Sequence, residues 1–208
     1  DMLAEYFIHD GGDTAKWRLK GHAEKEYWKW VATWAVCVRK PSDLGYEDCG
    51  YELPKLIFHP QILESKVHEF ELVPAAAETL SERREARKEG LQDRVNATAD
   101  MVNNSDEQWL VWCDYNDESA SLNRSIPDGT EVKGSDDAEY KENAALDFSN
   151  KKVRCLISKP SIFGFGSNWQ NCHNMIFCGL SDSYEKFYQA VRRCWRYGQK
   201  EDVNVYIF

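Results

Sequence analysis

The sequence predicts an α/β fold, in which a mainly parallel sheet is covered by helices on both faces and preceded by a helical N-terminal extension. Two observations predict it. After residue 104, short strand-like runs alternate with helical segments, and each run is apolar at consecutive positions, as in strands buried on both faces. Before residue 104 the chain is rich in aromatic residues and turn formers and lacks this alternation. We therefore expect an extension over residues 1–104 and the sheet domain over residues 105–208.

The extension is expected to contain two helices and one short strand. The first helix, over residues 24–38, carries an apolar stripe at offsets of four, three and four, formed by Tyr27, Val31, Trp34 and Val38. Aromatic side chains can also stack on nucleic-acid bases, but packing within the protein already explains this spacing. A short strand is expected over residues 56–58, and a polar helix from about residue 75 to residue 103 with a bend or break at Gly90.

The sheet domain is expected to contain strands and helices in alternation. The strands are predicted over residues 109–113, 131–133, 153–158, 175–178 and 203–208. Helices are predicted over residues 137–148 and 183–197, and a loop that leads into a helix is predicted over residues 116–122. In open parallel sheets, ligands bind at the loops that follow the carboxyl ends of the strands. Three such loops carry most of the polar residues of interest, and their sequences are CDYNDES, KGSDD and SKPSIFGFGSNWQ.

The net charge of −9 is unevenly distributed along the 208 residues. Residues 151–208 hold nine lysines and arginines against four acids, a local charge of +5, whereas residues 1–150 carry −14. The C-terminal part can therefore present a basic surface to an anion, although the whole chain is acidic.

The cysteine pattern is typical of a reduced protein. None of the seven cysteines forms a CxxC pair, and several stand inside apolar runs, such as Cys113 in LVWC and Cys178 in MIFC. We interpret them as core residues and expect no metal site. No apolar stretch approaches the about 20 residues that span a bilayer, and no signal peptide is visible, so we expect a cytoplasmic protein with no membrane partner. Because the first residue is Asp1 rather than Met, a fragment of a longer chain is expected.

The segment QAVRRCWRYGQ, residues 189–199, is the most informative part of the sequence. On a helix, Gln189, Arg193 and Arg196 lie at offsets of four and three and share one face. Guanidinium groups do not lose their proton and offer planar forks of donors that suit phosphate oxygens. Such a face is unfavourable unless an anion lies opposite it, and we predict the triphosphate of a nucleotide there. Arg192 points about 100° away from this face and is compatible with a surface position.

A glycine-containing loop follows the strand-like run CLIS. Gly164 and Gly166 allow the backbone to approach a phosphate closely and to adopt positive φ, and Asn168 can bond either a ligand or the loop itself. Phe165 and Trp169 can either stack on bases or form an apolar seat beneath the loop. Both interpretations stay open.

Together these segments resemble the second RecA-like domain of superfamily-2 helicases and translocases, and most of all the Swi/Snf-type branch with its phage-encoded members. Motif VI of that branch runs Gln, three residues, Arg, two residues, Arg, one residue and Gly-Gln, and residues 189–199 match it throughout. Its motif V, Gly-x-Gly-x-Asn, is similar to Gly164–Asn168. LVWCDYNDES resembles motif IV, and KGSDD resembles the Gly-Ser turn before the next helix. The resemblance covers residues 105–208 well and residues 36–60 loosely.

The resemblance implies a role for each candidate residue. Arg196 would be the arginine finger and Arg193 its catalytic partner. The nucleotide-binding residues would be Gln189, Gly164, Gly166, Asn168 and Gln199. Contacts to the nucleic-acid backbone would come from Asn116, Ser119, Gly134, Ser135, Ser158 and Lys159, although helix capping explains the residues near helix starts equally well.

The P-loop of this family and its Asp-Glu pair for magnesium are absent from the sequence. The resemblance therefore implies that ATP and Mg²⁺ are bound mainly by a first RecA-like domain of the same polypeptide, and that this chain alone does not hydrolyse ATP. It also implies duplex or single-stranded DNA as a partner, in the cytoplasm of a bacterium or a phage-infected host. Two alternatives stay open: a stand-alone nucleic-acid- or protein-binding module without ATPase activity, and a nucleotide-binding enzyme unrelated to helicases.

Overall fold

The computed structural model describes residues 2–10, 13–63, 85, 87–164 and 166–208. The chain divides into two compact units, Asp1–Tyr51 and Glu52–Phe208. None of the helices in the described part of the chain is long and apolar enough to cross a membrane.

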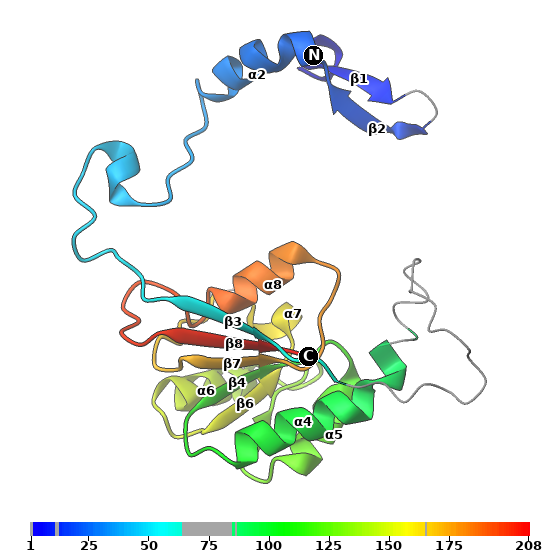
Figure 1. Cartoon of the computed structure of the whole chain (residues 1–208), viewed down its shortest axis with the longest axis vertical. Helices are drawn as coiled ribbons and strands as arrows, with labels where there is room; N and C mark the ends of the chain where they lie inside the picture. Colours follow the sequence, from blue (N-terminus) through cyan, green and yellow to red (C-terminus); the bar gives the residue numbers. More distant parts are fainter. Residues whose placement is uncertain (1, 11–12, 64–84, 86, 165) are drawn as a thin grey trace. The chain divides into compact units, whose positions relative to one another are not determined.

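The first unit consists of an antiparallel hairpin with short helices (Figure 1). Its elements are α1 (Met2–Tyr6), β1 (Phe7–Asp10), β2 (Asp13–Leu19), the 3₁₀ helix η1 (Gly21–Ala23), α2 (Glu24–Val31) and the 3₁₀ helix η2 (Pro41–Leu44). Ring contacts join α2 to the residues around β1, since the Tyr27 ring centroid lies 5.5 Å from that of Tyr6 and 5.3 Å from that of Phe7. Tyr27 is therefore a packing residue, as its spacing indicates.

The helix α2 ends at Val31 and does not reach residue 38, where the apolar spacing places its end. Beyond Val31 the backbone tightens into turns, and the Thr33 hydroxyl donates to the Trp30 carbonyl at 2.7 Å. Such a side-chain bond competes with the regular helical bonds. Trp34 and Val38 are consequently exposed, by 64% and 45%, and do not continue the stripe.

The second unit is built on a six-stranded sheet in which every pairing is parallel, in the order β3-β8-β7-β4-β6-β5. The strands are β3 (Leu56–Pro60), β4 (Trp109–Trp112), β5 (Gly129–Glu131), β6 (Cys155–Ser158), β7 (Asn174–Phe177) and β8 (Val203–Ile207). The helices are α4 (Leu91–Asn103), α5 (Asn116–Ser125), α6 (Ala138–Ser149), α7 (Pro160–Phe163) and α8 (Tyr184–Val191). This is the α/β fold that the sequence predicts.

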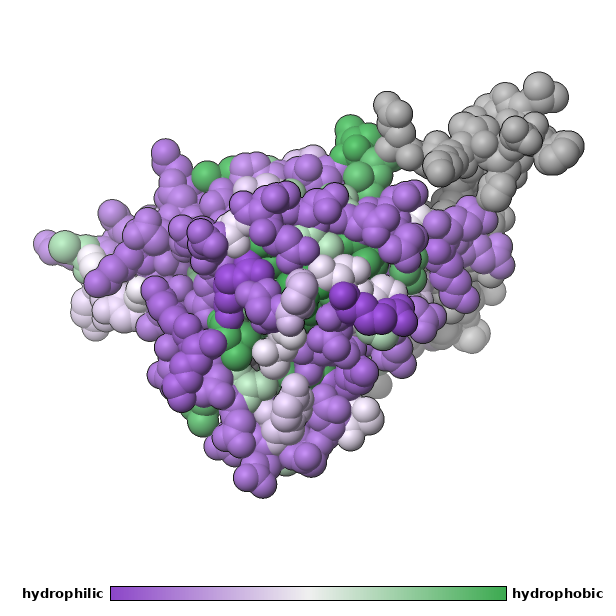
Figure 2. Space-filling model, turned by 90° about the horizontal axis from the view of Figure 1, so that it is seen from below, coloured by the Kyte–Doolittle hydropathy of each residue, from purple (hydrophilic) through white to green (hydrophobic). Residues whose placement is uncertain are grey.

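Alternate residues of each strand enter two separate cores. In β4, Leu110 and Trp112 join the core under α6, α7 and α8, whereas Trp109 and Val111 join the core under α4 and α5. Figure 1 shows α7 and α8 on one side of the sheet and α4 and α5 on the other. Because both faces are covered, the run WLVW is apolar at every position. The outer surface drawn in Figure 2 is, by contrast, mainly hydrophilic.

The sheet domain begins earlier than residue 105, the boundary that the sequence suggests. β3 pairs along its whole length with β8, and α4 buries Val95, Ala99 and Val102 against the sheet. The expected boundary leaves both elements in the extension, because spacing within a segment does not reveal which distant segment it packs against. α4 starts after Gly90, where the sequence predicts a break; the part of that predicted helix over residues 75–84 lies outside the described residues.

Several further elements differ from the prediction at their ends, and β5 and α8 are two of them. β5 occupies Gly129–Glu131 rather than residues 131–133, and α8 ends at Val191 rather than at residue 197. The carbonyl of Arg193 accepts the backbone N–H of Trp169 at 2.9 Å, so it is not used to continue the helix. The residues after α8 therefore form turns.

Five of the seven cysteines are buried, as expected for core residues: Cys113, Cys155, Cys172, Cys178 and Cys194. Burial raises the pKa of the Cys113 and Cys178 thiols to about 12, so both stay protonated and unreactive near neutral pH. Cys37 and Cys49 are exposed.

A buried ion pair joins α4 to α5. Nη2 of Arg94 lies 2.6 Å from Oε1 of Glu118, whose side chain is fully buried. Arg94 also donates to the carbonyls of Cys178 and Arg87, and the second oxygen of Glu118 accepts two backbone N–H groups just before α5. The pair therefore fixes the start of α5 and the end of β7 against α4.

Gly179 leaves the space that the Glu118 carboxylate occupies. A Cβ atom at position 179 would lie 2.7 Å from Oε1 of Glu118 and closer still to Oε2. We therefore expect Gly179→Ala to push the carboxylate away from Arg94 and to lower the free energy of unfolding by about 1–3 kcal/mol. Urea denaturation measures this. Gly134→Ala is the matched control, because a Cβ atom there meets nothing within 4 Å; equal stability losses in the two variants would contradict the expectation.

Candidate nucleotide and nucleic-acid site

Two glycines shape the loop between α7 and β7. Gly164 is buried, and a Cβ atom there would overlap the carbonyl oxygen of Pro160. Gly166 has a φ of +84°, a left-handed conformation that glycine adopts without strain. Asn168, beyond them, is exposed. The glycines thus set the path of the loop and present Asn168 at its surface.

Trp169 anchors this loop in the core. It is 1% exposed, and its ring centroid lies 5.3 Å from those of Phe148 and Phe163, both in edge-on geometry. Its indole Nε1 donates to the carbonyl of Ala145 at 3.3 Å. Of the two interpretations of Trp169, the apolar seat is therefore the one observed, and Phe165 lies outside the described residues.

Arg193 and Arg196 converge on one oxygen atom. Nη1 of each guanidinium donates to the carbonyl of Ser167, at 3.0 Å from Arg193 and 3.1 Å from Arg196. They reach it from the turns after α8, and not from one face of a helix as the spacing predicts. The glycine loop and the segment 189–199 are therefore a single structural unit.

Gln189 also holds Arg193, through two hydrogen bonds. The Gln189 backbone carbonyl accepts from Nε of Arg193 at 2.9 Å, and its side-chain Oε1 accepts from Nη2 at 3.3 Å. Gln189 and Arg193 are thus brought together as the sequence predicts. The acceptors that Arg193 meets among the described residues are neutral oxygens.

No carboxylate faces Arg193 or Arg196 among the described residues, in contrast to Arg94 and Arg154. Arg94 pairs with Glu118, and Arg154 pairs with Asp128. Arg193 is only 8% exposed, and its pKa is lowered first by burial and then by the positive charge of Arg196. Two adjacent cations, one of them buried, are destabilising unless an anion lies near them. The arrangement is complementary to a phosphate group.

Gln199 is engaged by the protein itself. It is 8% exposed. Its Nε2 donates to the carbonyls of Cys172 and Cys194, and its Oε1 accepts the backbone N–H groups of Lys200 and Glu201. Because both ends of the amide are used in this way, Gln199 fixes the end of the arginine segment and does not offer these groups to a nucleotide.

Four of the nucleic-acid candidates lie at the edge where the strands end. Asn116 begins α5 after β4, Gly134 and Ser135 follow β5, and Lys159 directly follows β6. Since the carboxyl ends of parallel strands meet at one edge, these residues share that edge. Lys159 also lines a hollow of about 240 Å³ together with Lys186 of α8.

Ser119 and Ser158 do not belong to that surface, which corrects the prediction for both. They are 3% and 0% exposed. The Ser119 hydroxyl donates to the carboxylate of Glu131, and the Ser158 hydroxyl donates to the Val132 carbonyl at 3.0 Å. Both side chains point into the domain, because Ser158 is the last residue of a strand buried on both faces and Ser119 lies on the inner side of α5.

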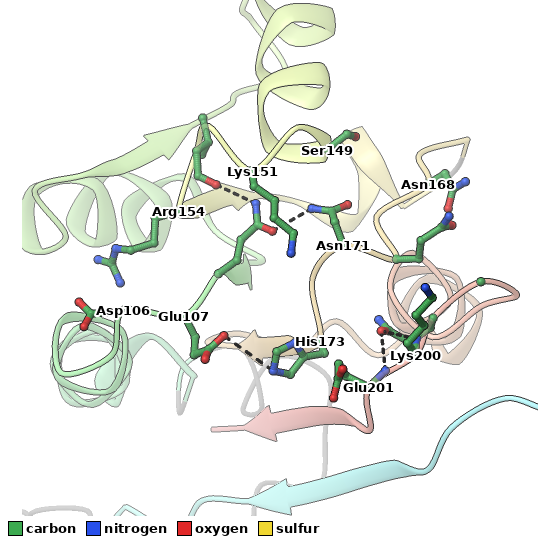
Figure 3. A pocket seen from close by; sticks show the side chains of 15 residues that line it. Asp106, Glu107, Ser149, Lys151, Arg154, Asn168, Asn171, His173, Lys200 and Glu201 are labelled. Carbon is green, nitrogen blue, oxygen red and sulfur yellow. Dashed lines mark hydrogen bonds and ion pairs between the residues drawn. The ribbon is translucent and has the colours of Figure 1, made fainter.

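A polar depression lies at the opposite edge, where the strands begin (Figure 3). It measures about 1090 Å³ and is lined by the residues that precede β4, β6, β7 and β8, together with Asn168. Asn171 donates to Gln108 at 2.8 Å, and His173 lies 4.0 Å from Glu107. The chain between β6 and β7 thus runs from Lys159 at one edge to Asn168 at the other. It therefore connects the two edges physically.

Sequence reasoning missed two contacts that organise the site. Glu118 stands at the third position of α5, where a capping-box carboxylate reaches back to the helix start, and this spacing is a signal for its burial. Trp195 donates from its indole Nε1 to the carbonyl of Pro54 at 2.8 Å. Pairing over such a sequence separation leaves no signal in a single sequence. The described residues include no cluster of three or more His, Cys, Asp or Glu side chains that could hold a metal ion.

Parts of this chain are similar to a known protein family and to solved structures. Residues 93–198, more than half of the chain, match the family described as “Helicase conserved C-terminal domain”. Among solved structures, the C-terminal part of the Fun30 ATPase domain is 20% identical, with a TM-score of 0.49 and coverage of 55% of this chain and 40% of that one. The C-terminal domain of the DEAD-box protein Dbp5 is 10% identical, with a TM-score of 0.48 and coverage of 56% and 70%. No curated protein matches the chain.

Proposed function

Because this chain belongs to the family of helicase conserved C-terminal domains, we propose that it is the C-terminal motor lobe of an ATP-dependent DNA helicase or translocase of the Swi/Snf type, encoded by a phage or prophage. Its parallel sheet with helices on both faces is the RecA-like fold of such lobes. In this proposal it closes on a first RecA-like domain of the same polypeptide and completes an ATP site between the two.

The observation that carries the proposal is the pair of guanidinium groups at Ser167. Arg193 and Arg196 lie beside each other with neutral acceptors only. When the γ-phosphate is transferred, negative charge spreads over its oxygens, and an arginine delivered to it stabilises that charge. Arg196 is the finger, since its guanidinium makes a single bond, to Ser167, within the described part of the chain, and Arg193 is its partner, oriented by Gln189.

The residues present fit the phosphates of ATP and not its Mg²⁺. Magnesium requires carboxylate and water oxygens, whereas the side chains at this site are arginines and amides. We therefore assign the binding of Mg²⁺ to the first lobe. The C-terminal lobe, formed by this chain, contacts the phosphates with the arginine pair and with the backbone of Gly164, Gly166 and Asn168.

For nucleic acid we propose the edge where the strands end. Asn116, Gly134 and Ser135 are exposed there, and Lys159 adds a positive charge. Backbone N–H groups, small polar side chains and a lysine contact phosphates without reading sequence. The segment from Lys159 to Asn168 then links the nucleic-acid edge to the arginine pair through Ser167.

ATPase measurements on the polypeptide that carries both lobes test this function. We expect turnover to rise with duplex or single-stranded DNA and to rise less with RNA, all at one salt concentration. Lys159→Ala should weaken DNA binding and reduce the slope of log affinity against log salt by about 0.7–0.9, the loss of one phosphate contact. Lys200→Ala removes an equal charge at the opposite edge and should leave the slope unchanged. A two-lobe protein with no ATPase activity would instead favour a stand-alone binding module.

A further inference from the structure

Three hydrogen bonds fasten the beginning of the second unit to the segment that follows α8. Trp195 Nε1 donates to the Pro54 carbonyl at 2.8 Å. Immediately after it, the Lys55 N–H donates to Oδ1 of Asp202 at 2.9 Å, and the Lys55 carbonyl accepts the N–H of Val203 at 2.8 Å. The second unit begins at Glu52, so the chain that arrives from the first unit is held within its first few residues.

Trp195 lies between the two arginines of the site in the sequence, and its own place is well fixed. Its ring packs against the core under α6, α7 and α8, and its backbone N–H bonds to the Val191 carbonyl at 3.1 Å. The guanidinium of Arg192 lies over the ring, 5.1 Å from its centroid, a cation–π distance. The side chain thus has one polar atom, and that atom is used on Pro54.

We propose that Trp195 is a positioning residue that ties the arginine pair to the chain entering from the first unit. The inference rests on the proposed function and adds a physical connection between the entering chain and the finger. Because Trp195 immediately precedes Arg196, a displacement of the entering chain at Pro54 is transmitted to the backbone that carries the finger. Movement of the entering chain and placement of the finger are thereby coupled through one indole N–H.

The coupling acts on geometry and not on nucleotide affinity. The Trp195 indole bonds Pro54, whereas the Arg196 guanidinium bonds Ser167, so the loss of the indole donor leaves the phosphate-facing groups chemically intact. What is lost is the fixed placement of the finger, and misplacement by about 1 Å can lower a rate by about a hundredfold. The expected signature is therefore a lower kcat at an unchanged KM for ATP.

Trp195→Phe in the two-lobe protein is the test, because phenylalanine keeps an aromatic ring and removes the donor. Trp109→Phe is the matched control: its indole Nε1 is buried and has no hydrogen-bond partner in the described part of the chain. Both variants lose the same ring volume. We expect Trp195→Phe to lower the DNA-stimulated kcat by about tenfold to a hundredfold with KM for ATP unchanged, and Trp109→Phe to leave both constants as they are.

A second readout does not depend on turnover. Amide hydrogen exchange in this chain should accelerate at residues 196–199 and at Lys55 in Trp195→Phe and stay unchanged there in Trp109→Phe. If the two variants give the same kcat and the same exchange, the positioning role is overturned, while loss of activity in Arg196→Ala would still support the finger. If Arg196→Ala keeps full turnover, the proposed function fails first, and the two failures are thereby distinguished.

Discussion

Arg196→Ala is expected to lower DNA-stimulated ATP hydrolysis by the two-lobe protein by about 10³-fold or more, with the affinity for ATP largely kept. The reason is that Arg196 makes one bond within its own lobe, to Ser167 at 3.1 Å, and faces no carboxylate among the described residues. It contributes little to the fold and acts where charge develops on the transferred phosphate. Single-turnover hydrolysis and binding of a fluorescent ATP analogue measure the two effects separately.

Arg196 is a better target for this experiment than Arg193. Arg193 also bonds Gln189 and is buried, so its replacement changes the loop as well as the charge. Arg124→Ala is the control, since Arg124 is exposed in the last turn of α5 and bonds the nearby Ser121. Wild-type turnover in Arg196→Ala would remove the basis for an arginine finger in this lobe.

Glu118→Ala is expected to lower the free energy of unfolding of the chain by about 3–5 kcal/mol. It leaves the Arg94 guanidinium buried without its carboxylate, and it also takes the acceptor from two backbone N–H groups at the start of α5. Arg94→Ala should cost a similar amount, because the fully buried carboxylate then loses its cation. Urea denaturation followed by far-UV circular dichroism measures both.

The double variant Arg94→Met, Glu118→Leu decides why the single variants are destabilised. Replacing both partners of a buried pair by apolar residues is often far less destabilising than removing one, so we expect the double variant to be more stable than either single one. Lys152→Ala is the control, because its pair with Asp147 is exposed at the surface and contributes little. Additive losses in the double variant would show that the two charges are not coupled.

The sequence predicts the centre of the sheet better than its borders. The runs WLVW, CLI and MIF are apolar at consecutive positions because both faces of the central strands are covered, and they lie in β4, β6 and β7 as predicted. β3 carries the same kind of short run, but its neighbour β8 is far away in the sequence, so its place at the sheet edge has no local signal.

The sequence predicts those features of the site that depend on neighbouring residues, and it does not predict those that depend on contacts between distant segments. The close approach of Gly164 to the Pro160 carbonyl and the positive φ of Gly166 both require glycine, and Gln189 meets Arg193 because the backbone turns directly after α8. The convergence of both arginines on Ser167 depends on the turns after α8, which exist because the Arg193 carbonyl bonds a residue of another loop. Ser158 shows the converse: a hydroxyl at a strand end suggests a ligand, but burial on both faces directs it to Val132.

The pairing of β3 with β8 has a consequence for how the chain is made. β3 leaves the ribosome early, yet its partner emerges only after the rest of the sheet domain has been synthesised. At typical translation rates of about 5–20 residues per second, that wait is on the order of ten seconds, much longer than the microseconds in which helices form. During this time the backbone of β3 is unpaired on both sides, and the nascent chain carries an open strand edge that a chaperone or a second nascent chain can reach before β8 does.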